Sequence, residues 1–313
     1  MNFAFTFPGQ GSQAVAMGRP LYERYPAARA VFEEVDDALG EPLSKTIFEG
    51  PEEALRLTRN AQPALMAVSL AAVRAAEAEG IRVSDAAMVA GHSLGEYSAL
   101  ASAGALELGD AARLLRLRGD AMQAAVAEGE GAMAALLGLD LEAAEAVAED
   151  ARKEGVCDVA NDNAPGQVVI SGARAAVEAG VAAAKEKGAK RAVLLPVSAP
   201  FHCGLMAPAG EAMANALKIA EVRAPCVPLM ANISAKLLTA PDAIRTSLVA
   251  QVTGRVRWRE SVAAMAASGV TTLVEIGAGK VLTGLAKRID KSLEAFAVNN
   301  PEDLAALVEK RAA

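Results

Sequence analysis

The sequence predicts an α/β protein in which a large domain with a buried sheet carries a smaller α/β unit. Hydrophobic residues make up 53% of the 313 residues and aromatic residues only 4%, so much of the apolar content is Ala, Leu and Val, as in helices packed around a buried sheet. Apolar alternation at residues 3–7 and an apolar run at residues 86–90 predict strands of that sheet. Alternating strand and helix patterns between residues 131 and 197 predict the smaller unit.

The large domain begins with a strand and continues mainly as helices. The strand at residues 3–7 alternates Phe with smaller residues and ends at the turn-forming run Pro8-Gly9-Gln10-Gly11. The run at residues 86–90 reads as a short buried strand, and a helix over residues 96–103 follows it closely. Apolar spacing near the helical period predicts further helices over residues 27–39, 63–79 and 110–127.

The smaller unit has its own order of elements. The pattern predicts strands over residues 132–139, 156–160, 167–171 and 191–197, with helices over residues 141–153 and 173–187. The order βαββαβ is the ferredoxin-like pattern, which can close on itself as a small domain. We therefore predict a ferredoxin-like domain over residues 130–197, inserted into a catalytic domain formed by residues 1–129 and 198–313.

Charge and apolar runs exclude several classes of protein. The net charge of −7 argues against a nucleic-acid-binding protein, which needs a broad basic face. A single buried Arg could still bind an anionic small molecule. The apolar run at residues 64–73 ends at Arg74, well short of the ~20 residues that a spanning helix needs. The first residues lack a basic region and are broken by Pro8-Gly9, so we expect no signal peptide and a cytoplasmic protein.

The cysteines and histidines argue against a metal site. The three cysteines are Cys157, Cys203 and Cys226, which show no CxxC spacing, and the chain has only two histidines. A Cys/His zinc site is therefore not expected, and a reducing compartment fits an odd number of cysteines best. We expect no metal and no cofactor.

The motif Gly91-His92-Ser93-Leu94-Gly95 predicts a serine nucleophile. It follows the predicted strand at residues 86–90 and precedes the predicted helix at residues 96–103, which is the setting of a Gly-x-Ser-x-Gly elbow. Glycines on both sides leave room for the sharp turn that exposes the hydroxyl. The backbone N–H of Leu94, beside the positive end of the helix, is the natural donor to an oxyanion.

The general base follows by elimination. A serine hydroxyl needs a neighbouring base near neutral pH, and His supplies it most often. His92 is adjacent to Ser93, and adjacent side chains diverge, which leaves His202 after the last strand of the small domain. No acidic residue stands out as the group that orients His202, so a backbone carbonyl is a plausible acceptor at its other ring nitrogen.

Two further patterns lead to open or negative interpretations. Residues 9–14 fit G-x-G-x-x-A, but a dinucleotide site needs a second strand about twenty residues later, where this sequence predicts a helix. The helix over residues 110–127 carries Arg113, Arg116 and Arg118, of which one could turn inward and bind a carboxylate. The helical pattern does not say which one.

The combined motifs resemble those of one family. These motifs are PGQGSQ at 8–13, GHSLGEYSAL at 91–100, Arg118, Asn161 with PGQVVISG at 165–172, APFH at 199–202 and QVTGRVRW at 251–258. In order and spacing they resemble the malonyl-CoA:acyl carrier protein transacylases over nearly the whole chain. Val252 and Gly254 look unlike the commonest residues of the family at those positions.

The resemblance implies a fold, a reaction and residue roles. It implies a hydrolase-like α/β core and a ping-pong transfer of malonyl from malonyl-CoA to Ser93 and then to the phosphopantetheine thiol of acyl carrier protein, for fatty acid synthesis. We expect a monomer. His202 is the implied base and the main-chain carbonyl of Gln251 its orienting acceptor. The implied substrate-binding residues are Gln10 and Leu94 (oxyanion hole), Arg118 (carboxylate), Asn161, and Phe201 (preference for malonyl).

Three alternatives remain at this point. A serine esterase or thioesterase would share the elbow but pass the acyl group to water. The transacylase subunit of a malonate decarboxylase would use a different carrier protein. A non-enzymatic scaffold would leave Ser93 and His202 without a role.

Overall fold

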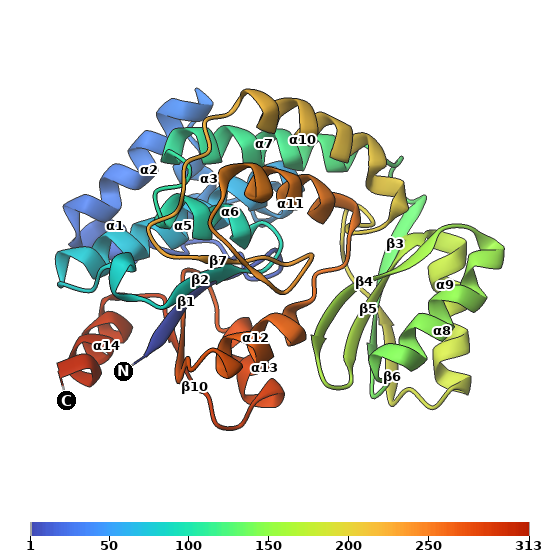
Figure 1. The fold of residues 1–313 in the computed structure, drawn as a ribbon. Coiled ribbons are helices and arrows are strands. Elements are labelled where there is room, and N and C mark those ends of the chain that lie inside the picture. Colours follow the sequence, from blue (N-terminus) through green and yellow to red (C-terminus); the bar gives the residue numbers. More distant parts are fainter. Residues whose placement is uncertain (1, 313) are drawn as a thin grey trace.

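The computed structural model describes residues 2–312, which form two β-sheets. Figure 1 shows the smaller sheet beside the larger one, with its own pair of helices. The mixed α/β class predicted from composition is therefore confirmed. Residues 1 and 313 of the predicted catalytic domain lie outside the described residues. The larger sheet has the strand order β10 (Glu294–Val298), β9 (Thr272–Ile276), β1 (Phe3–Phe7), β2 (Met88–Gly91), β7 (Leu229–Met230) and β8 (Leu237–Leu238).

Strand β1 lies at the centre of the larger sheet and is buried on both faces. It pairs in parallel with β2 on one side and β9 on the other, and only the edge pair β7–β8 is antiparallel. Phe3, Phe5 and Phe7 belong to the core on one face, whereas Ala4 belongs to the core on the other. The alternation that predicted this strand therefore places large side chains on one face and small ones on the other.

Helices cover both faces of the larger sheet (Figure 1). Those on the Phe face contribute to the largest core, and α12 and α13 contribute to the core of the opposite face. Within the described residues no helix is both long and apolar enough to cross a membrane. The helices outside the smaller sheet are α1 (Arg19–Arg24), α2 (Pro26–Leu39), α3 (Leu43–Glu49), α4 (Glu52–Arg56), α5 (Thr58–Ala78), α6 (Gly95–Ser102), α7 (Leu108–Ala124), α10 (Ala207–Ile219), α11 (Pro241–Thr253), α12 (Trp258–Ala267), α13 (Val281–Ile289) and α14 (Pro301–Ala312).

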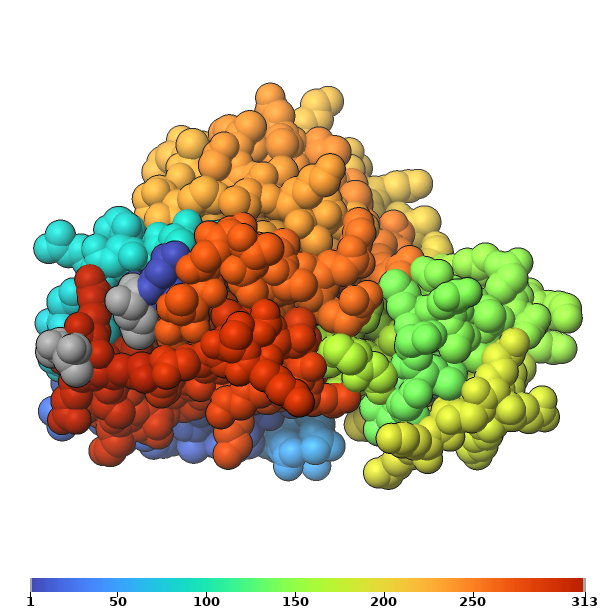
Figure 2. Space-filling model, turned by 60° about the horizontal axis from the view of Figure 1, so that its bottom comes forward, coloured from blue at the N-terminus to red at the C-terminus, as the bar shows by residue number. Residues whose placement is uncertain are grey.

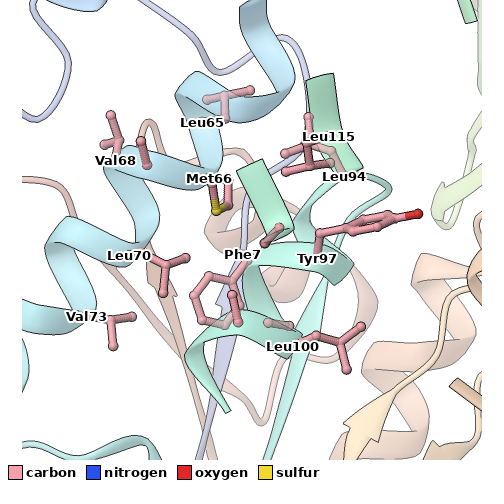
Figure 3. Close-up of a cluster of buried hydrophobic side chains, with 14 of the residues drawn as sticks. Phe7, Leu65, Met66, Val68, Leu70, Val73, Leu94, Tyr97, Leu100 and Leu115 are labelled. Carbon is pink, nitrogen blue, oxygen red and sulfur yellow. The ribbon is translucent and has the colours of Figure 1, made fainter. Parts of the chain in front are cut away.

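The serine turn packs on the largest hydrophobic core. Figure 3 shows Phe7 from β1, Leu65 from α5, Leu94 and Tyr97 at the start of α6, and Leu115 from α7 in one cluster. Each is almost fully buried, and burying a large apolar side chain stabilises the fold by about 1.5–3 kcal/mol. The turn after β2 is therefore anchored by packing on three helices.

Helix α5 begins earlier than the sequence pattern predicts. The predicted start at residue 63 is wrong by five residues, because α5 runs from Thr58 and contains Pro63. The N–H groups of Asn60 and Ala61 bond to the Leu57 carbonyl, which starts the helix before the proline. Pro63 is the sixth residue of the helix and has no N–H to donate, so α5 continues through it with one backbone hydrogen bond missing.

The smaller sheet has the order β4-β5-β3-β6, with all neighbours antiparallel. Its elements follow one another as βαββαβ, in the order that the sequence predicts, and Figure 2 shows this green-to-yellow segment as a lobe beside the rest. The two helices and the sheet share a separate apolar core. The elements are β3 (Gly131–Leu137), α8 (Leu141–Ala151), β4 (Cys157–Ala164), β5 (Gln167–Ala173), α9 (Arg174–Glu186) and β6 (Arg191–Leu194).

Strand β4 connects the smaller sheet to the rest of the chain. It extends to Ala164 instead of ending at the predicted residue 160. Beyond that point Asn161 forms an isolated parallel bridge with Val256, which precedes α12. This pairing brings the polar end of β4 toward the carboxyl end of the larger sheet, where the serine turn lies.

Candidate active site

The backbone of the serine turn explains its glycines. Ser93 has a φ of 54°, in the left-handed region that L-residues seldom adopt. A Cβ on Gly91 would lie 1.9 Å from the Gly95 carbonyl oxygen, and one on Gly95 would lie 2.3 Å from the Phe7 carbonyl oxygen. Side chains at either position would force the turn open, so the two glycines allow β2 to pass directly into α6 with Ser93 at the tip.

His202 lies against the Ser93 hydroxyl. Ser93 Oγ is 2.7 Å from His202 Nε2, and His202 Nδ1 is 2.8 Å from the main-chain carbonyl oxygen of Gln251. Because a carbonyl oxygen only accepts hydrogen bonds, Nδ1 carries the proton of the neutral ring and Nε2 is free to accept from the serine. The sequence left open whether an acidic side chain or a backbone carbonyl accepts from Nδ1 of His202. The structure shows that it is the backbone carbonyl of Gln251.

Burial keeps His202 neutral. Its side chain is almost fully enclosed, which lowers its pKa to about 3, and the nearby positive charge of Arg118 acts in the same direction. The imidazole is thus unprotonated at neutral pH and able to take a proton from Ser93.

His92 points away from the Ser93 hydroxyl. Its Nε2 lies 2.8 Å from Asn163 Oδ1 on β4, and its ring packs near Trp258 with centroids 5.6 Å apart. Burial lowers the pKa of His92 as well. This histidine therefore joins the turn to the smaller sheet, and of the two histidines only His202 contacts the Ser93 hydroxyl.

The three arginines of α7 have different surroundings. Arg113 is exposed and pairs with Asp110, and Arg116 pairs with Glu41. Arg118 is 1% exposed and lies beside Ser93. Of the three candidates, only Arg118 turns inward.

Arg118 is a buried cation held by uncharged oxygen atoms. Its Nη1 donates to Gln62 Oε1 at 2.8 Å, and its Nη2 donates to Gln251 Oε1 at 2.8 Å and to Ser93 Oγ at 3.2 Å. Among the described residues its Nε has no hydrogen-bond partner. Burial lowers the pKa of Arg118, since no anion in contact offsets the lost hydration. An acyl group with a carboxylate would supply that anion.

The backbone N–H groups of Leu94, which follows Ser93, and of Gln10, in the loop after β1, have no backbone acceptor within residues 2–312. The loop of Gln10 packs directly on the serine turn, because a Cβ on Gly9 would lie 2.8 Å from the His92 carbonyl oxygen. The side chain of Gln10 is held by Thr58, to which its Nε2 donates at 3.2 Å. Unsatisfied N–H groups beside a nucleophile are what an oxyanion hole requires.

Within residues 2–312, neither Asn161 nor Phe201 forms a hydrogen bond with Ser93. Asn161 is 6% exposed on β4, where its backbone bridges Val256. Phe201 immediately precedes His202 and packs in the largest core. Their roles in substrate binding stay predictions.

Sequence reasoning missed the residues that hold the serine turn in place. Asn232, after β7, accepts from the Ser93 N–H at 2.8 Å and donates from Nδ2 to the Gly91 carbonyl at 2.7 Å. The Asn232 N–H in turn donates to Glu96 Oε1 at 2.9 Å, and Gln62 holds Arg118. The only sequence signal for any of them was the acid next to Gly95, which reads equally well as a helix start.

The side chains that most often bind metals are not clustered in the described part of the chain. Within residues 2–312 no three His, Cys, Asp or Glu side chains lie close enough together to hold a metal ion. The site described above consists of a serine, a neutral histidine, a buried arginine and free backbone donors.

A serine activated by histidine beside free backbone N–H groups defines a site for acyl transfer. The acyl transferase domain family matches residues 4–305, so the chain belongs to this family.

The curated relatives narrow the comparison within that family. The chain is 47% identical to the malonyl CoA-acyl carrier protein transacylase of Bacillus subtilis (strain 168), over 97% of this chain and 95% of that protein. It is 48% identical to the protein of the same name from Escherichia coli (strain K12), over 98% and 99%. The resemblance predicted from the motifs is confirmed.

Solved structures agree with the curated relatives. An acyl-carrier-protein S-malonyltransferase from Bartonella henselae has a TM-score of 0.97 and 58% identity, with both chains covered completely. A malonyl-transacylase solved in complex with a type II polyketide acyl-carrier protein has a TM-score of 0.96 and 43% identity, covering 99% of this chain and 100% of that one.

Proposed function

We propose that the protein transfers malonyl from malonyl-CoA to the phosphopantetheine thiol of acyl carrier protein, for fatty acid synthesis, through a malonyl ester of Ser93. The observation that carries the proposal is the position of the Ser93 hydroxyl, 2.7 Å from the base His202 and 3.2 Å from the buried cation Arg118. The Ser93 hydroxyl thus contacts both a base and a cation. The base can take the proton of the hydroxyl, and the cation can bind an acyl group that bears a carboxylate. The names of the relatives support the same pair of substrates.

In the first half of the reaction His202 Nε2 accepts the proton of Ser93 as Oγ attacks the thioester carbonyl of malonyl-CoA. The carbonyl oxygen becomes negative, and the free N–H groups of Gln10 and Leu94 are the proposed donors to it. His202 then gives the proton to the CoA sulfur, which leaves as a thiol. The malonyl carboxylate would bind Arg118 through two parallel hydrogen bonds. The guanidinium is available for this ion pair because the side chains that it contacts, Gln62 and Gln251, are uncharged.

In the second half the same groups act in reverse order. The thiol of the carrier protein gives its proton to His202 and attacks the malonyl ester, and Ser93 recovers its proton when it leaves. The Gln251 carbonyl, 2.8 Å from Nδ1, keeps the ring in one tautomer through both halves. Asn161 and Phe201 are the remaining proposed substrate contacts.

We further propose the finer fold assignment. The parallel sheet with a serine turn after a strand and before a helix supports a hydrolase-like core. The antiparallel order β4-β5-β3-β6 with two helices on one face supports a ferredoxin-like small domain over residues 130–197, with residues 1–129 and 198–313 forming the catalytic domain.

Location, oligomeric state and cofactor use complete the proposal. All three cysteines are free, which supports a reducing compartment such as the cytoplasm. We propose a monomer that needs no metal or cofactor. Size-exclusion chromatography with light scattering, and activity after dialysis against a chelator, would check these two points.

Intact-mass spectrometry tests the reaction. Mixing the protein with malonyl-CoA should add one malonyl mass, and the adduct should persist in buffer and disappear when the phosphopantetheine form of acyl carrier protein is added. An adduct that is lost in buffer at the same rate with or without the carrier would identify a thioesterase instead. Absence of any adduct would exclude both.

A further inference from the structure

Glu96 is a buried acid in the site for which the proposed reaction has no use. It is 0% exposed in the first turn of α6, and both of its oxygens accept hydrogen bonds. Oε1 accepts from the Asn232 N–H at 2.9 Å, and Oε2 accepts from Nε2 of Gln251. Burial raises the pKa of Glu96 to about 7, although both donors and the charge of Arg118 oppose the shift. A buried carboxylate costs free energy, so its position calls for a role.

The side chain of Gln251 lies between Glu96 and Arg118. Its Nε2 donates to Glu96 and, at 2.9 Å, to the Ser93 carbonyl, whereas its Oε1 accepts from Arg118 Nη2 at 2.8 Å. A carboxamide has one donating end and one accepting end. Which end faces Arg118 decides whether the guanidinium meets an oxygen or an NH2 group.

We propose that Glu96 is a positioning residue for malonyl recognition. Its ionised carboxylate accepts but never donates, so together with the Ser93 carbonyl it holds the NH2 end of Gln251 and keeps the oxygen end toward Arg118. The guanidinium is thereby fixed beside Ser93 before the substrate arrives. This inference rests on the proposed function, since it concerns how the malonyl carboxylate is selected.

Replacing Glu96 by Gln would disrupt this arrangement. The Asn232 N–H is a fixed backbone donor, so the new amide must turn its oxygen to Asn232 and its NH2 group to Gln251. That NH2 group then faces the NH2 group of Gln251, which cannot simply turn over, because its oxygen would meet the Ser93 carbonyl and its NH2 group would meet Arg118. Gln251 must therefore shift, and the guanidinium loses the oxygen that holds it beside Ser93. The base is unaffected, because His202 uses the main-chain carbonyl of Gln251.

The variant should therefore affect the rate of acylation by malonyl-CoA more than the rate of acylation by acetyl-CoA. Glu96→Gln should slow acylation of Ser93 by malonyl-CoA roughly ten- to a hundredfold, because a buried donor is left unpaired at the carboxylate site. Acylation by acetyl-CoA needs no carboxylate partner and should change less than about threefold. Rapid-quench mixing followed by intact-mass spectrometry measures both rates on the same protein.

Glu275→Gln is the matched control. Glu275 is 1% exposed and also accepts backbone N–H groups, from Leu282 and Thr283, but none of its hydrogen-bond partners belongs to the site. This variant loses the charge of a buried carboxylate without touching Gln251. Its ratio of malonyl to acetyl acylation should match that of the wild type.

The wild-type protein offers a second test that needs no variant. Protonation gives Glu96 a donor, as the amide does, so the ratio of malonyl to acetyl acylation should fall as the pH drops through about 7. The charged or titratable groups that face this cluster are Arg118, Tyr97 and His202. A guanidinium stays charged, burial raises the pKa of Tyr97, and His202 with a pKa of about 3 stays neutral, so none of them titrates near pH 7. In Glu96→Gln the ratio should not vary with pH.

The outcomes distinguish the inference from the proposed function. A wild type that forms no malonyl adduct overturns the proposed function and this inference with it. If the adduct forms but Glu96→Gln slows both acyl groups by the same factor, Glu96 is merely structural and the inference is wrong. If that variant does not fold, the pH dependence decides: a wild-type ratio that is constant from about pH 5 to 8 overturns the inference.

Discussion

The chain contains two similar turns, and only one of them is a candidate active site. The turn from β2 to α6 and the turn from β9 to α13 both lead from a buried parallel strand into a helix, and their strands flank β1. At α13 the carboxylate of Glu275 accepts from the N–H groups of Leu282 and Thr283 at 3.1 and 2.7 Å. At α6 the N–H of Leu94 has no acceptor within residues 2–312.

The comparison teaches that a strand–turn–helix pattern can form an active site where a backbone N–H group at the helix start has no acceptor within the protein. The second turn places glycines at its left-handed positions, with φ of 131° at Gly277 and 80° at Gly279. The first turn places Ser93, the proposed nucleophile, in the left-handed region, at a strain of about 1–3 kcal/mol. The first turn also lies beside the buried cation Arg118. At the second turn the carboxylate of Glu275 already occupies the N–H groups of the helix start.

Removing the nucleophile should have the largest effect. Ser93→Ala should reduce malonyl transfer to acyl carrier protein by about 10⁴-fold or more, because neither His202 nor the free N–H groups can form the ester. The adduct with malonyl-CoA should vanish in intact-mass spectra. An adduct of normal yield in this variant would show that another residue is acylated, and the first turn would lose its distinction.

Removing the cation should separate malonyl from acetyl. Losing the partner of a buried charge costs about 3–5 kcal/mol, so Arg118→Ala should lower malonyl transfer several hundredfold or more, while acetyl transfer survives or improves. Arg118→Lys should fall between, since an ammonium gives only a point charge. Steady-state kinetics with both acyl-CoA substrates measures the split. A parallel decline would make Arg118 structural.

A side chain at a glycine of the first turn should lower the stability of the fold. Gly91→Ala places a Cβ 1.9 Å from the Gly95 carbonyl oxygen, and we expect a loss of roughly 3 kcal/mol or more in the free energy of unfolding. The matched control is Gly284→Ala in α13, where nothing lies within 4 Å of the added atom. That helical change should stabilise by about 0.5–1 kcal/mol. Urea denaturation compares them, and equal stabilities would refute the steric argument.

Disturbing the second turn should have the smallest effect. Glu275→Gln keeps an oxygen for one N–H of α13 but removes the acceptor for another, which should lower the free energy of unfolding by about 1 kcal/mol. Malonyl transfer should stay close to the wild-type rate, because Glu275 forms its hydrogen bonds with Leu282 and Thr283, which lie outside the site. A loss of transfer without a loss of stability would mean that the second turn also takes part in the reaction.

Most of the fold follows from local patterns. Strand β1 was predicted at its observed bounds, because the alternation of Phe with small residues is complete within five positions. The order βαββαβ also follows from local periodicity. The start of α5 does not, because the carbonyl of Leu57 begins the helix ahead of Pro63 and periodicity carries no information about that hydrogen bond.

The candidate site divides in the same way. Ser93 is recognisable from five consecutive residues, and His202 from the scarcity of histidine. Arg118 required the family resemblance, because three arginines share its helix. Glu96 and Asn232 could not be predicted: they meet across 136 residues of sequence, and Glu96 meets Gln251 across 155. Such contacts depend on how the helices pack, which no short motif records.

The acceptor that orients His202 is a main-chain atom, and this limits what mutational scanning can reveal. Any residue placed at 251 brings the same carbonyl oxygen, so an alanine scan would report the loss of the Gln251 side chain and overlook the contact to Nδ1. The third member of the proposed catalytic group would therefore leave no trace in a mutational scan. Only a chemical change to the peptide bond after residue 251, such as an oxygen-to-sulfur exchange in semisynthetic protein, would expose its contribution.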